Sequence, residues 1–203
     1  MLTLYHSPFS RSSRVIRLLH ELNAMEEVDI EIVTIRRQDG SGGHDPRNPH
    51  PEGKVPLLVQ DGVEIWETSA IILTLTDHFA ASGIAPQIGD PLRGRYLSWL
   101  AWYGNVLEPV MVHEVAGLSH PVIHTTFRGR AEMEARLVSA LEAAPYLLGD
   151  SFSAADLLVV SPWNWFADAA PQAPVVQDWI ARCTARPSFA QMQAFDAERM
   201  AAA

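Results

Sequence analysis

The stretch at residues 48–72, NPHPEGKVPLLVQDGVEIWETSAII, decides the fold of this chain. Two short apolar runs in it are joined by a turn at Asp61-Gly62, and this arrangement predicts a β-hairpin. The strongly apolar segment 68–81 follows without a linker, and Thr68 is a favourable residue for the start of a helix. The stretch therefore predicts a hairpin that leads directly into a helix.

The residues before this stretch supply the rest of a small α/β unit. Residues 2–5 are typical of a short strand, and apolar positions at helical spacing run from Ser13 to a stop at Asn23. Residues 28–35 are β-branched and largely alternating, which indicates a second strand, whereas residues 36–53 have the composition of a loop. A strand–helix–strand crossover followed by a hairpin predicts a mixed sheet with helices packed against it.

The second half of the chain has the pattern of an all-α domain. Apolar residues recur at helical spacing in five segments, which are 91–115, 126–144, 154–168, 175–185 and 188–199. We therefore predict an α/β domain over residues 1–81, a linker over residues 82–91 and an all-α domain over residues 92–203.

Composition and charge narrow the class of protein. A hydrophobic content of 48% and a charged content of 19% are ordinary for a soluble globular chain, and no apolar run approaches the roughly 18 residues that cross a bilayer. The net charge of −9 argues against nucleic acid as a partner. One cysteine, Cys183, and the lack of a signal-peptide pattern predict a cytoplasmic protein without disulfides. Basic residues nevertheless gather between residues 11 and 54, which suggests a small anionic ligand.

Four short motifs carry a resemblance to a known family. NPHPEGKVPLL at 48–58 has the pattern Asn-Pro…Gly-x-Val-Pro-x-Leu, and WETSAII at 66–72 has the pattern Glu-Ser-x-Ala-Ile with threonine at the serine position. GDSFSAADLLV at 149–159 has the pattern Gly-x-x-x-Ser/Thr-x-Ala-Asp, and ARPSF follows at 185–189. In order and spacing these motifs resemble those of the soluble glutathione S-transferase superfamily, and specifically a bacterial member with a serine-type active site.

The resemblance implies a thioredoxin-like domain followed by a helical bundle domain, with glutathione as co-substrate and no metal. The bond before Pro56 is cis in the family, and an extended peptide would pair with the backbone of Val55 as an added strand does. Glu67 would face the ammonium of the γ-glutamyl group, and Thr68 at a helix N-terminus would face its carboxylate. Read from the residues alone, Glu67 and Thr68 also suit a simple helix start. Lys54, Ser12 and Arg11 complete the predicted glutathione site.

The thiol activator is predicted within YHSPFSRSS at residues 5–13. Compared with the motif strand-x-x-Pro-x-Cys-x-x-Cys-helix of thioredoxin-like domains, Ser10 falls on the nucleophilic cysteine. A free thiol has a pKa near ~8.5, and lowering it by about two units requires ~2.7 kcal/mol of anion stabilisation, which one hydroxyl and a helix N-terminus could supply. We expect Ser10 to be catalytic, with Ser12 or Tyr5 as the alternatives and a plain helix cap as the structural interpretation of Ser10.

The expected activity is conjugation of the glutathione thiolate to small hydrophobic electrophiles, with peroxidase activity as a second use of the same thiol. The resemblance implies a detoxification enzyme that forms a homodimer, in which the helical domain supplies the hydrophobic substrate site. Trp102 and Tyr103, with Phe9 opposite, are the candidates for its lining. A glutathione-dependent isomerase of maleyl-type compounds and a non-catalytic binding module are the alternatives. Ser153 and Asp156 form a capping box, which we assign to folding rather than to chemistry.

Overall fold

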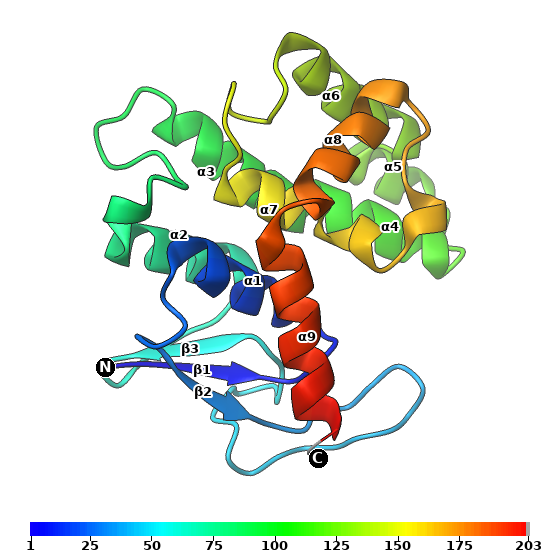
Figure 1. Ribbon diagram of the computed structural model, residues 1–203. Coiled ribbons are helices and arrows are strands. Elements are labelled where there is room, and N and C mark those ends of the chain that lie inside the picture. Colours follow the sequence, from blue (N-terminus) through cyan, green and yellow to red (C-terminus); the bar gives the residue numbers. More distant parts are fainter. Residues whose placement is uncertain (202–203) are drawn as a thin grey trace. The chain divides into compact units, whose positions relative to one another are not determined.

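A computed structural model describes residues 1–201 of the chain (Figure 1). The chain divides into two compact units. The first contains Met1–Ser82 and the final segment from Pro187 onward, and the second contains Gly83–Arg186. Along residues 1–201, no helix is both long enough and apolar enough to cross a membrane.

The first unit is built on a four-stranded mixed sheet with the strand order β2-β1-β3-β4. The strands are β1 (Leu2–His6), β2 (Asp29–Ile32), β3 (Leu57–Gln60) and β4 (Val63–Ile65). β1 pairs with β2 in parallel and with β3 antiparallel, and β3 pairs with β4 antiparallel, so the predicted mixed sheet with a hairpin is confirmed. β2 is shorter than the predicted strand because the N–H of Thr34 turns to the carboxylate of Asp45, at 3.1 Å, instead of to a neighbouring strand.

Helices α1 (Ser13–Leu22), α2 (Thr68–His78) and α9 (Pro187–Ala201), with the short 3-10 helix η1 (Ala80–Ser82), complete this unit. α1 starts and stops where the sequence predicts, and Asn23 ends it in the left-handed conformation with φ of 53°. Its apolar residues Val15, Leu18 and Leu19 are fully buried.

α9 packs along α1, so the end of the chain joins the unit that contains its start (Figure 1). Arg17 of α1 is 2% exposed, and its Nε donates to Ser188 Oγ at 3.3 Å. The Ser188 hydroxyl donates to Glu21 Oε1 at 2.5 Å. This division differs from the predicted one, which placed the whole of residues 92–203 in the helical domain. Local periodicity identifies a helix but not the unit against which it packs.

The long segment between β2 and β3 is irregular and is organised around the buried carboxylate of Asp45. Asp45 accepts hydrogen bonds from the backbone N–H groups of Thr34 and Arg47 at 3.1 and 3.0 Å. The Arg47 guanidinium adds bonds at 3.1 and 2.7 Å. These bonds, led by that from the Arg47 side chain, hold the pKa of the Asp45 carboxyl well below its usual range.

Replacing Asp45 by asparagine should therefore destabilise the protein at neutral pH and have less effect in acid. A lowered carboxyl pKa in the folded state stabilises that state above the unfolded pKa of about 3.9, and this stabilisation is lost as the pH falls below that value. Urea unfolding at pH 7 and pH 3 measures the difference, with the exposed Asp29→Asn as the control. An equal deficit at both pH values would show that the negative charge is not what these contacts stabilise.

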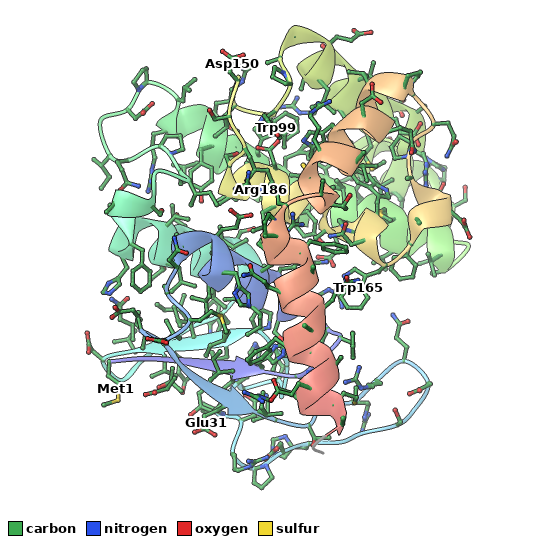
Figure 2. The ribbon with its side chains drawn as sticks, viewed as in Figure 1. Met1, Glu31, Trp99, Asp150, Trp165 and Arg186 are labelled. Carbon is green, nitrogen blue, oxygen red and sulfur yellow. The ribbon has the colours of Figure 1, made fainter. Side chains whose placement is uncertain are left out.

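The second unit is helical throughout its described length, apart from an isolated bridge between Tyr146 and Gly149. Its elements are α3 (Arg93–Trp102), η2 (Tyr103–Leu107), α4 (Glu108–Val115), α5 (Pro121–Phe127), α6 (Arg130–Ala143), α7 (Ala154–Val160), η3 (Ser161–Asn164), η4 (Ala167–Ala169) and α8 (Pro174–Thr184). Buried aromatic side chains contribute to its core, where Trp99 packs edge-on against Trp102 with ring centres 5.1 Å apart. Figure 2 labels Trp99.

Three predicted helices in this unit differ from the observed ones. The predicted helix 154–168 ends as an α-helix at Val160 and is followed by the 3-10 helices η3 and η4. The predicted helix 91–115 is divided into α3 and α4 by a π-helical turn, η2. α5 was not predicted: Pro121 begins it, and the His120 ring accepts a hydrogen bond from the N–H of Val122. Arg128, with φ of 63°, separates α5 from α6, so the predicted helix 126–144 began too early.

Candidate active site

All four strands have one terminus at the same edge of the sheet in the first unit. β1 and β2 run parallel, so both end at this edge. Tyr5 lies opposite Leu57 in an antiparallel pair, which places the start of β3 beside the end of β1. Leu58 lies opposite Ile65, which brings the end of β4 to the same edge. The segments adjoining this edge contain most of the predicted site residues, namely Ser10, Ser12, Val55, Pro56, Glu67 and Thr68.

The loop from β1 to α1 is held in a compact form by α9. Phe9 has a positive φ of 53°, a conformation that needs support in a residue with a side chain. Its N–H donates to Asp196 Oδ2 at 2.8 Å, and the Ser13 hydroxyl donates to the same oxygen at 2.5 Å. The N–H of Ser10 in turn donates to Ser13 Oγ at 3.2 Å. A carboxylate near the end of the chain therefore fixes the shape of a loop near its start.

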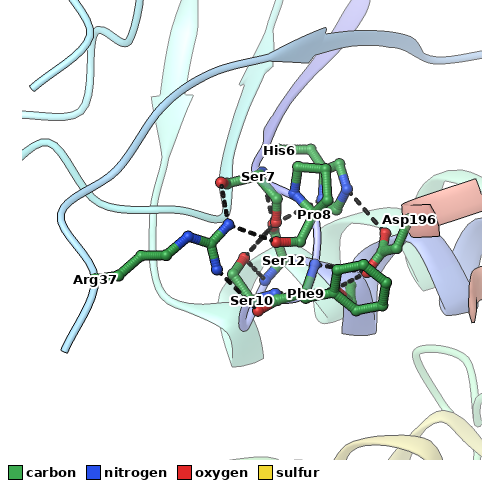
Figure 3. Close-up of polar contacts among 9 residues, drawn as sticks. His6, Ser7, Pro8, Phe9, Ser10, Ser12, Arg37 and Asp196 are labelled. Atoms are coloured by element: carbon green, nitrogen blue, oxygen red, sulfur yellow. Dashed lines mark hydrogen bonds and ion pairs between the residues drawn. The ribbon is translucent and has the colours of Figure 1, made fainter. Parts of the chain in front are cut away.

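Ser10 and Ser12 form a pair of hydroxyls within this loop (Figure 3). Their Oγ atoms are 2.8 Å apart, and Ser10 Oγ also donates to the carbonyl of Ser7 at 2.7 Å. Ser12 is completely buried, whereas Ser10 is partly exposed. Ser12 stands at the start of α1 without capping the helix through its side chain. Ser10 Oγ accepts a hydrogen bond from the N–H of Ser12 at 3.2 Å, which is compatible with the interpretation of Ser10 as a helix cap.

Behind the hydroxyl pair lies a buried histidine–aspartate pair. His6, the last residue of β1, and Asp196 of α9 are both completely buried. His6 Nδ1 is 2.7 Å from Ser12 Oγ, and His6 Nε2 is 3.0 Å from Asp196 Oδ1. The second contact has the distance of an ion pair but not the alignment of a linear hydrogen bond. In Figure 3 the carboxylate, the imidazole and the two hydroxyls follow one another in a row.

Arg37 covers the outer side of the loop. Its guanidinium donates to the carbonyl of Pro8 at 2.9 Å, to the carbonyl of Phe9 at 3.4 Å and to Ser7 Oγ at 3.4 Å (Figure 3). The segment after β2 thus holds three consecutive residues of the loop. Because these donors are engaged with the protein itself, Arg37 acts here as a clamp on the loop.

Val55 and Pro56 immediately precede β3, and the peptide bond between them is cis. This agrees with the expectation drawn from the family resemblance. Within residues 1–201, neither the N–H nor the C=O of Val55 has a backbone hydrogen-bond partner. Asn48 supports the segment from behind, because its side-chain amide donates to the carbonyl of Lys54 at 3.0 Å. The backbone of Val55 can accordingly accept an extended peptide as an additional strand.

Glu67 and Thr68 stand at the start of α2. Glu67 is the N-cap residue, yet its side chain makes no capping bond, and the carboxylate is exposed. Its φ is 69°, a left-handed conformation that costs a residue other than glycine of order 1 kcal/mol or more. An exposed carboxylate beside the amide groups of a helix N-terminus is available to a ligand.

The remaining predicted residues lie at the margin of this arrangement. Lys54 is exposed and pairs with Glu52, and this contact lowers the pKa of the Glu52 carboxyl. Arg11 is exposed on the loop. Tyr5 points to the opposite face of the sheet from His6, since successive residues of a strand alternate and β1 shows that alternation in burial.

The candidates for the hydrophobic substrate site differ in exposure. Trp102 and Tyr103 are 9% and 2% exposed and contribute to the core of the second unit, whereas Phe9 is 38% exposed in the first. Among the residues that the structure describes, no group of three metal-ligating side chains comes together.

His6 and Asp196 were not predicted as site residues, and Arg37 was predicted only as part of the basic segment between residues 11 and 54. In the sequence, His6 is an ordinary position of a predicted strand, and Arg37 is one of several arginines in a predicted loop. Asp196 is separated from the loop by almost the whole chain. The one local signal was the Arg36-Arg37 pair within a locally basic segment.

Comparisons with known proteins agree with this geometry. Residues 4–83 match the family model described as glutathione S-transferase, N-terminal domain, and residues 121–187 match that described as glutathione S-transferase, C-terminal domain. A relative from Hyoscyamus muticus described as glutathione S-transferase is 26% identical over 203 residues, which span 92% of this chain and 95% of the relative.

Solved structures show the same architecture. A sphingomonad glutathione S-transferase complexed with glutathione is 26% identical with a TM-score of 0.76, and the match covers 96% of this chain and 98% of the other. The ternary complex of BphK, a bacterial GST, is similar in fold with a TM-score of 0.76 at 22% identity, over 96% of this chain and 99% of that one.

Proposed function

We propose that this chain, which belongs to the glutathione S-transferase superfamily, binds glutathione at the sheet edge and transfers its thiolate to a small hydrophobic electrophile. The observation that carries the proposal is the partly exposed Ser10 hydroxyl, held at the start of a helix on the same edge as Val55 and Glu67. The relative from a sphingomonad that binds glutathione supports the choice of co-substrate.

The structure favours Ser10 over its two alternatives as the group that contacts the thiol. Ser12 has no exposed surface, so a ligand could reach it only after the loop rearranges. Tyr5 lies on the other face of the sheet. Ser10 alone of the three combines exposure with a position at the mouth of α1.

The rest of the site is suited to the peptide backbone of glutathione and to its γ-glutamyl end. Val55 offers an unpaired N–H and C=O to the peptide. The N-terminus of α2 with the Thr68 hydroxyl offers donors to the γ-glutamyl carboxylate, while Glu67 offers a carboxylate to the ammonium. Lys54 and Arg11 add positive charge at the margin, and Ser12 supports Ser10 from inside the loop.

These groups can supply the free energy that is needed to lower the pKa of the glutathione thiol. Making a thiol about 100-fold more acidic requires ~2.7 kcal/mol of preferential stabilisation of the thiolate. A hydrogen bond to a charged group supplies roughly 1.5–3 kcal/mol, and a helix N-terminus adds a fraction of that. The same thiolate could reduce a peroxide. The family resemblance implies that the helical domain supplies the hydrophobic substrate site, and that the enzyme is a cytoplasmic homodimer.

Conjugation is proposed ahead of isomerisation because Arg37, one of the cations that a dicarboxylate could use, is engaged with the loop. An isomerase acting on a dicarboxylate needs a free cation near the thiol. The guanidinium of Arg37 instead donates to the carbonyls of Pro8 and Phe9. Arg11, exposed on the same loop, is another cation near Ser10 that an isomerase could use.

Replacing Glu67 by glutamine should weaken glutathione binding roughly tenfold and leave kcat at saturating glutathione nearly unchanged. The substitution removes the charge that pairs with the ammonium, an interaction of about 1–2 kcal/mol at a partly wet site. Calorimetric titration with glutathione measures it. The control is Glu64→Gln, an exposed carboxylate of β4 in the same hairpin, which should leave the affinity unchanged. Equal affinities of wild type and Glu67→Gln would remove Glu67 from the site.

Retention on immobilised glutathione, followed by a panel of electrophiles, tests the proposed function as a whole. We expect the protein to be retained, to elute with free glutathione and to conjugate at least one hydrophobic electrophile in the panel. A protein that is retained but inactive on conjugation, peroxide and maleyl substrates would be a binding module. A protein that is not retained would contradict the proposed site.

A further inference from the structure

The buried pair of His6 and Asp196 has no part in the reaction as described so far. Burying an imidazole and a carboxylate is costly unless each meets a partner of suitable chemistry. Here the carboxylate faces the imidazole at 3.0 Å and the imidazole faces a hydroxyl at 2.7 Å. That hydroxyl, of Ser12, is 2.8 Å from the partly exposed hydroxyl of Ser10. The order carboxylate–imidazole–hydroxyl is one in which a carboxylate orients an imidazole and stabilises its protonated form.

The carbonyl of Ser7 is a further acceptor beside this row, 2.7 Å from Ser10 Oγ and 3.2 Å from Ser12 Oγ, and two proton arrangements run along the row from end to end. Each hydroxyl has one proton to donate, and a neutral imidazole donates from one nitrogen only. With His6 neutral and its proton on Nε2 towards Asp196, Ser12 donates to Nδ1 and Ser10 donates to Ser12. With His6 protonated, Nδ1 donates to Ser12 and Ser12 donates to Ser10. In the second state the Ser10 proton is released from Ser12, so it can donate to the carbonyl of Ser7, 2.7 Å away, or to a ligand in place of that carbonyl.

We infer that His6 receives the thiol proton of glutathione through Ser10 and Ser12, and that Asp196 stabilises the resulting imidazolium. The inference rests on the proposed function, because it requires the thiol to meet Ser10. In the initial state the S–H group donates to Ser10, Ser10 to Ser12, and Ser12 to His6 Nδ1. After transfer every bond in the row points the other way, and Ser10 donates to the thiolate.

The step is balanced in atoms and charge. The S–H bond breaks, each serine gives up one proton and takes another, and an N–H bond forms at Nδ1 of His6. The net result is one proton moved from sulfur to nitrogen, with no oxidant, reductant or water consumed. After the thiolate has attacked the electrophile, the imidazolium can return its proton along the same row to solvent or to the leaving group.

The carboxylate of Asp196 is held facing His6. Asp196 is fixed by two donors on its other oxygen, the Phe9 N–H and the Ser13 hydroxyl, so it cannot turn away from the imidazole. On the neighbouring strand β2, His6 lies opposite Ile32, which brings no charge.

Two cations lie further out. Arg37 holds the backbone and hydroxyl of the loop rather than the imidazole. Arg199 stacks on the ring of Phe195, whose centre is 5.8 Å from that of His6. Asp196 therefore supplies the charge in direct contact with His6.

His6 and Asp196 act through other residues, so they are positioning residues and their test must separate charge from packing. The variants are His6→Gln, Asp196→Asn and Ser12→Ala, of which Asp196→Asn keeps its size and an acceptor for Phe9. The readouts are the pH profile of kcat/KM for conjugation, the ultraviolet absorbance of the bound thiolate, and the affinity for glutathione. Ser188→Ala is the matched control, because it loosens the α9–α1 contact without touching the row.

We expect the three variants to lose about 10- to 100-fold in kcat/KM at neutral pH and to recover towards the wild-type rate at high pH, where the thiol ionises without help. Glutathione affinity should change less than threefold, and Ser188→Ala should follow the wild-type profile. The double variant His6→Gln/Ser12→Ala should be no worse than either single variant, since both interrupt the same row.

Profiles that superimpose on that of the wild type would overturn the inference. So would a loss that is the same at every pH, because it would indicate packing rather than proton transfer. If His6→Gln fails to fold, the pH profiles of Asp196→Asn and Ser12→Ala test the inference without it. Failure of the proposed function is distinguishable, because the wild type itself would then neither bind nor conjugate glutathione.

Discussion

Replacing Ser10 by alanine should lower kcat/KM for thiol conjugation roughly 10- to 100-fold and leave the fold unchanged. The lost interaction is a hydrogen bond to a charged sulfur, worth about 1.5–3 kcal/mol, and each ~1.4 kcal/mol corresponds to a factor of ten in rate. The effect should be greatest below neutral pH, where the thiolate depends most on its donor. The Ser10 side chain is small and partly exposed, so its removal leaves no cavity in the core.

The control for this variant is Ser98→Ala. Ser98 is an exposed serine of α3 whose hydroxyl donates to a carbonyl earlier in the chain, as that of Ser10 does. Its replacement should leave conjugation unchanged. If Ser10→Ala retained full kcat/KM at neutral pH, Ser10 would not be the thiol activator.

Replacing Asp156 by alanine should lower the free energy of unfolding by about 3–5 kcal/mol, the largest stability effect expected in this chain. Asp156 is 0% exposed in the second unit, and burial raises the pKa of its carboxyl against the opposing influence of its hydrogen bonds. Its oxygens accept from the Ser153 N–H and hydroxyl at 3.0 and 2.6 Å, from the Leu147 N–H at 2.9 Å and from Trp179 Nε1 at 2.9 Å. Each donor left buried without a partner costs about 1–3 kcal/mol.

Urea unfolding followed by tryptophan fluorescence measures this effect, since Trp179 is one of the donors. Asp150→Ala, at an exposed carboxylate just before the capping box (Figure 2), should change the stability by less than about 0.5 kcal/mol. A loss below about 1 kcal/mol for Asp156→Ala would show that the carboxylate does not organise α7, α8 and the preceding turn.

The sequence was most informative where structure is determined locally. The end of α1 at Asn23, the hairpin of β3 and β4 and the start of α2 at Thr68 each depend on a few neighbouring residues, and each was predicted. The family motifs led to the cis bond before Pro56. Local periodicity predicted the helix boundaries of the second unit less well. There η2 interrupts one predicted helix, and Arg128 separates the observed start of another from its predicted start.

The parts of the site that escaped prediction are those made by contacts between distant segments. His6 and Asp196 lie at opposite ends of the chain, and only the packing of α9 on α1 brings them together. From the sequence alone, a buried aspartate in an amphipathic helix cannot be distinguished from a surface aspartate, because the residues that surround it in the fold are not known. The same holds for the choice between Ser10 and Ser12, because two serines two residues apart differ in burial and not in any sequence pattern.

The most direct test of the central claim, that Ser10 stabilises the thiolate of glutathione, is an ultraviolet titration of glutathione bound to the wild type and to Ser10→Ala. We predict that the thiol bound to the wild type is about 100-fold more acidic than a free thiol, whose pKa is near ~8.5, and that most of this gain is lost in Ser10→Ala. A bound thiol that titrates like free glutathione in the wild type, or equally low in both proteins, would contradict the claim.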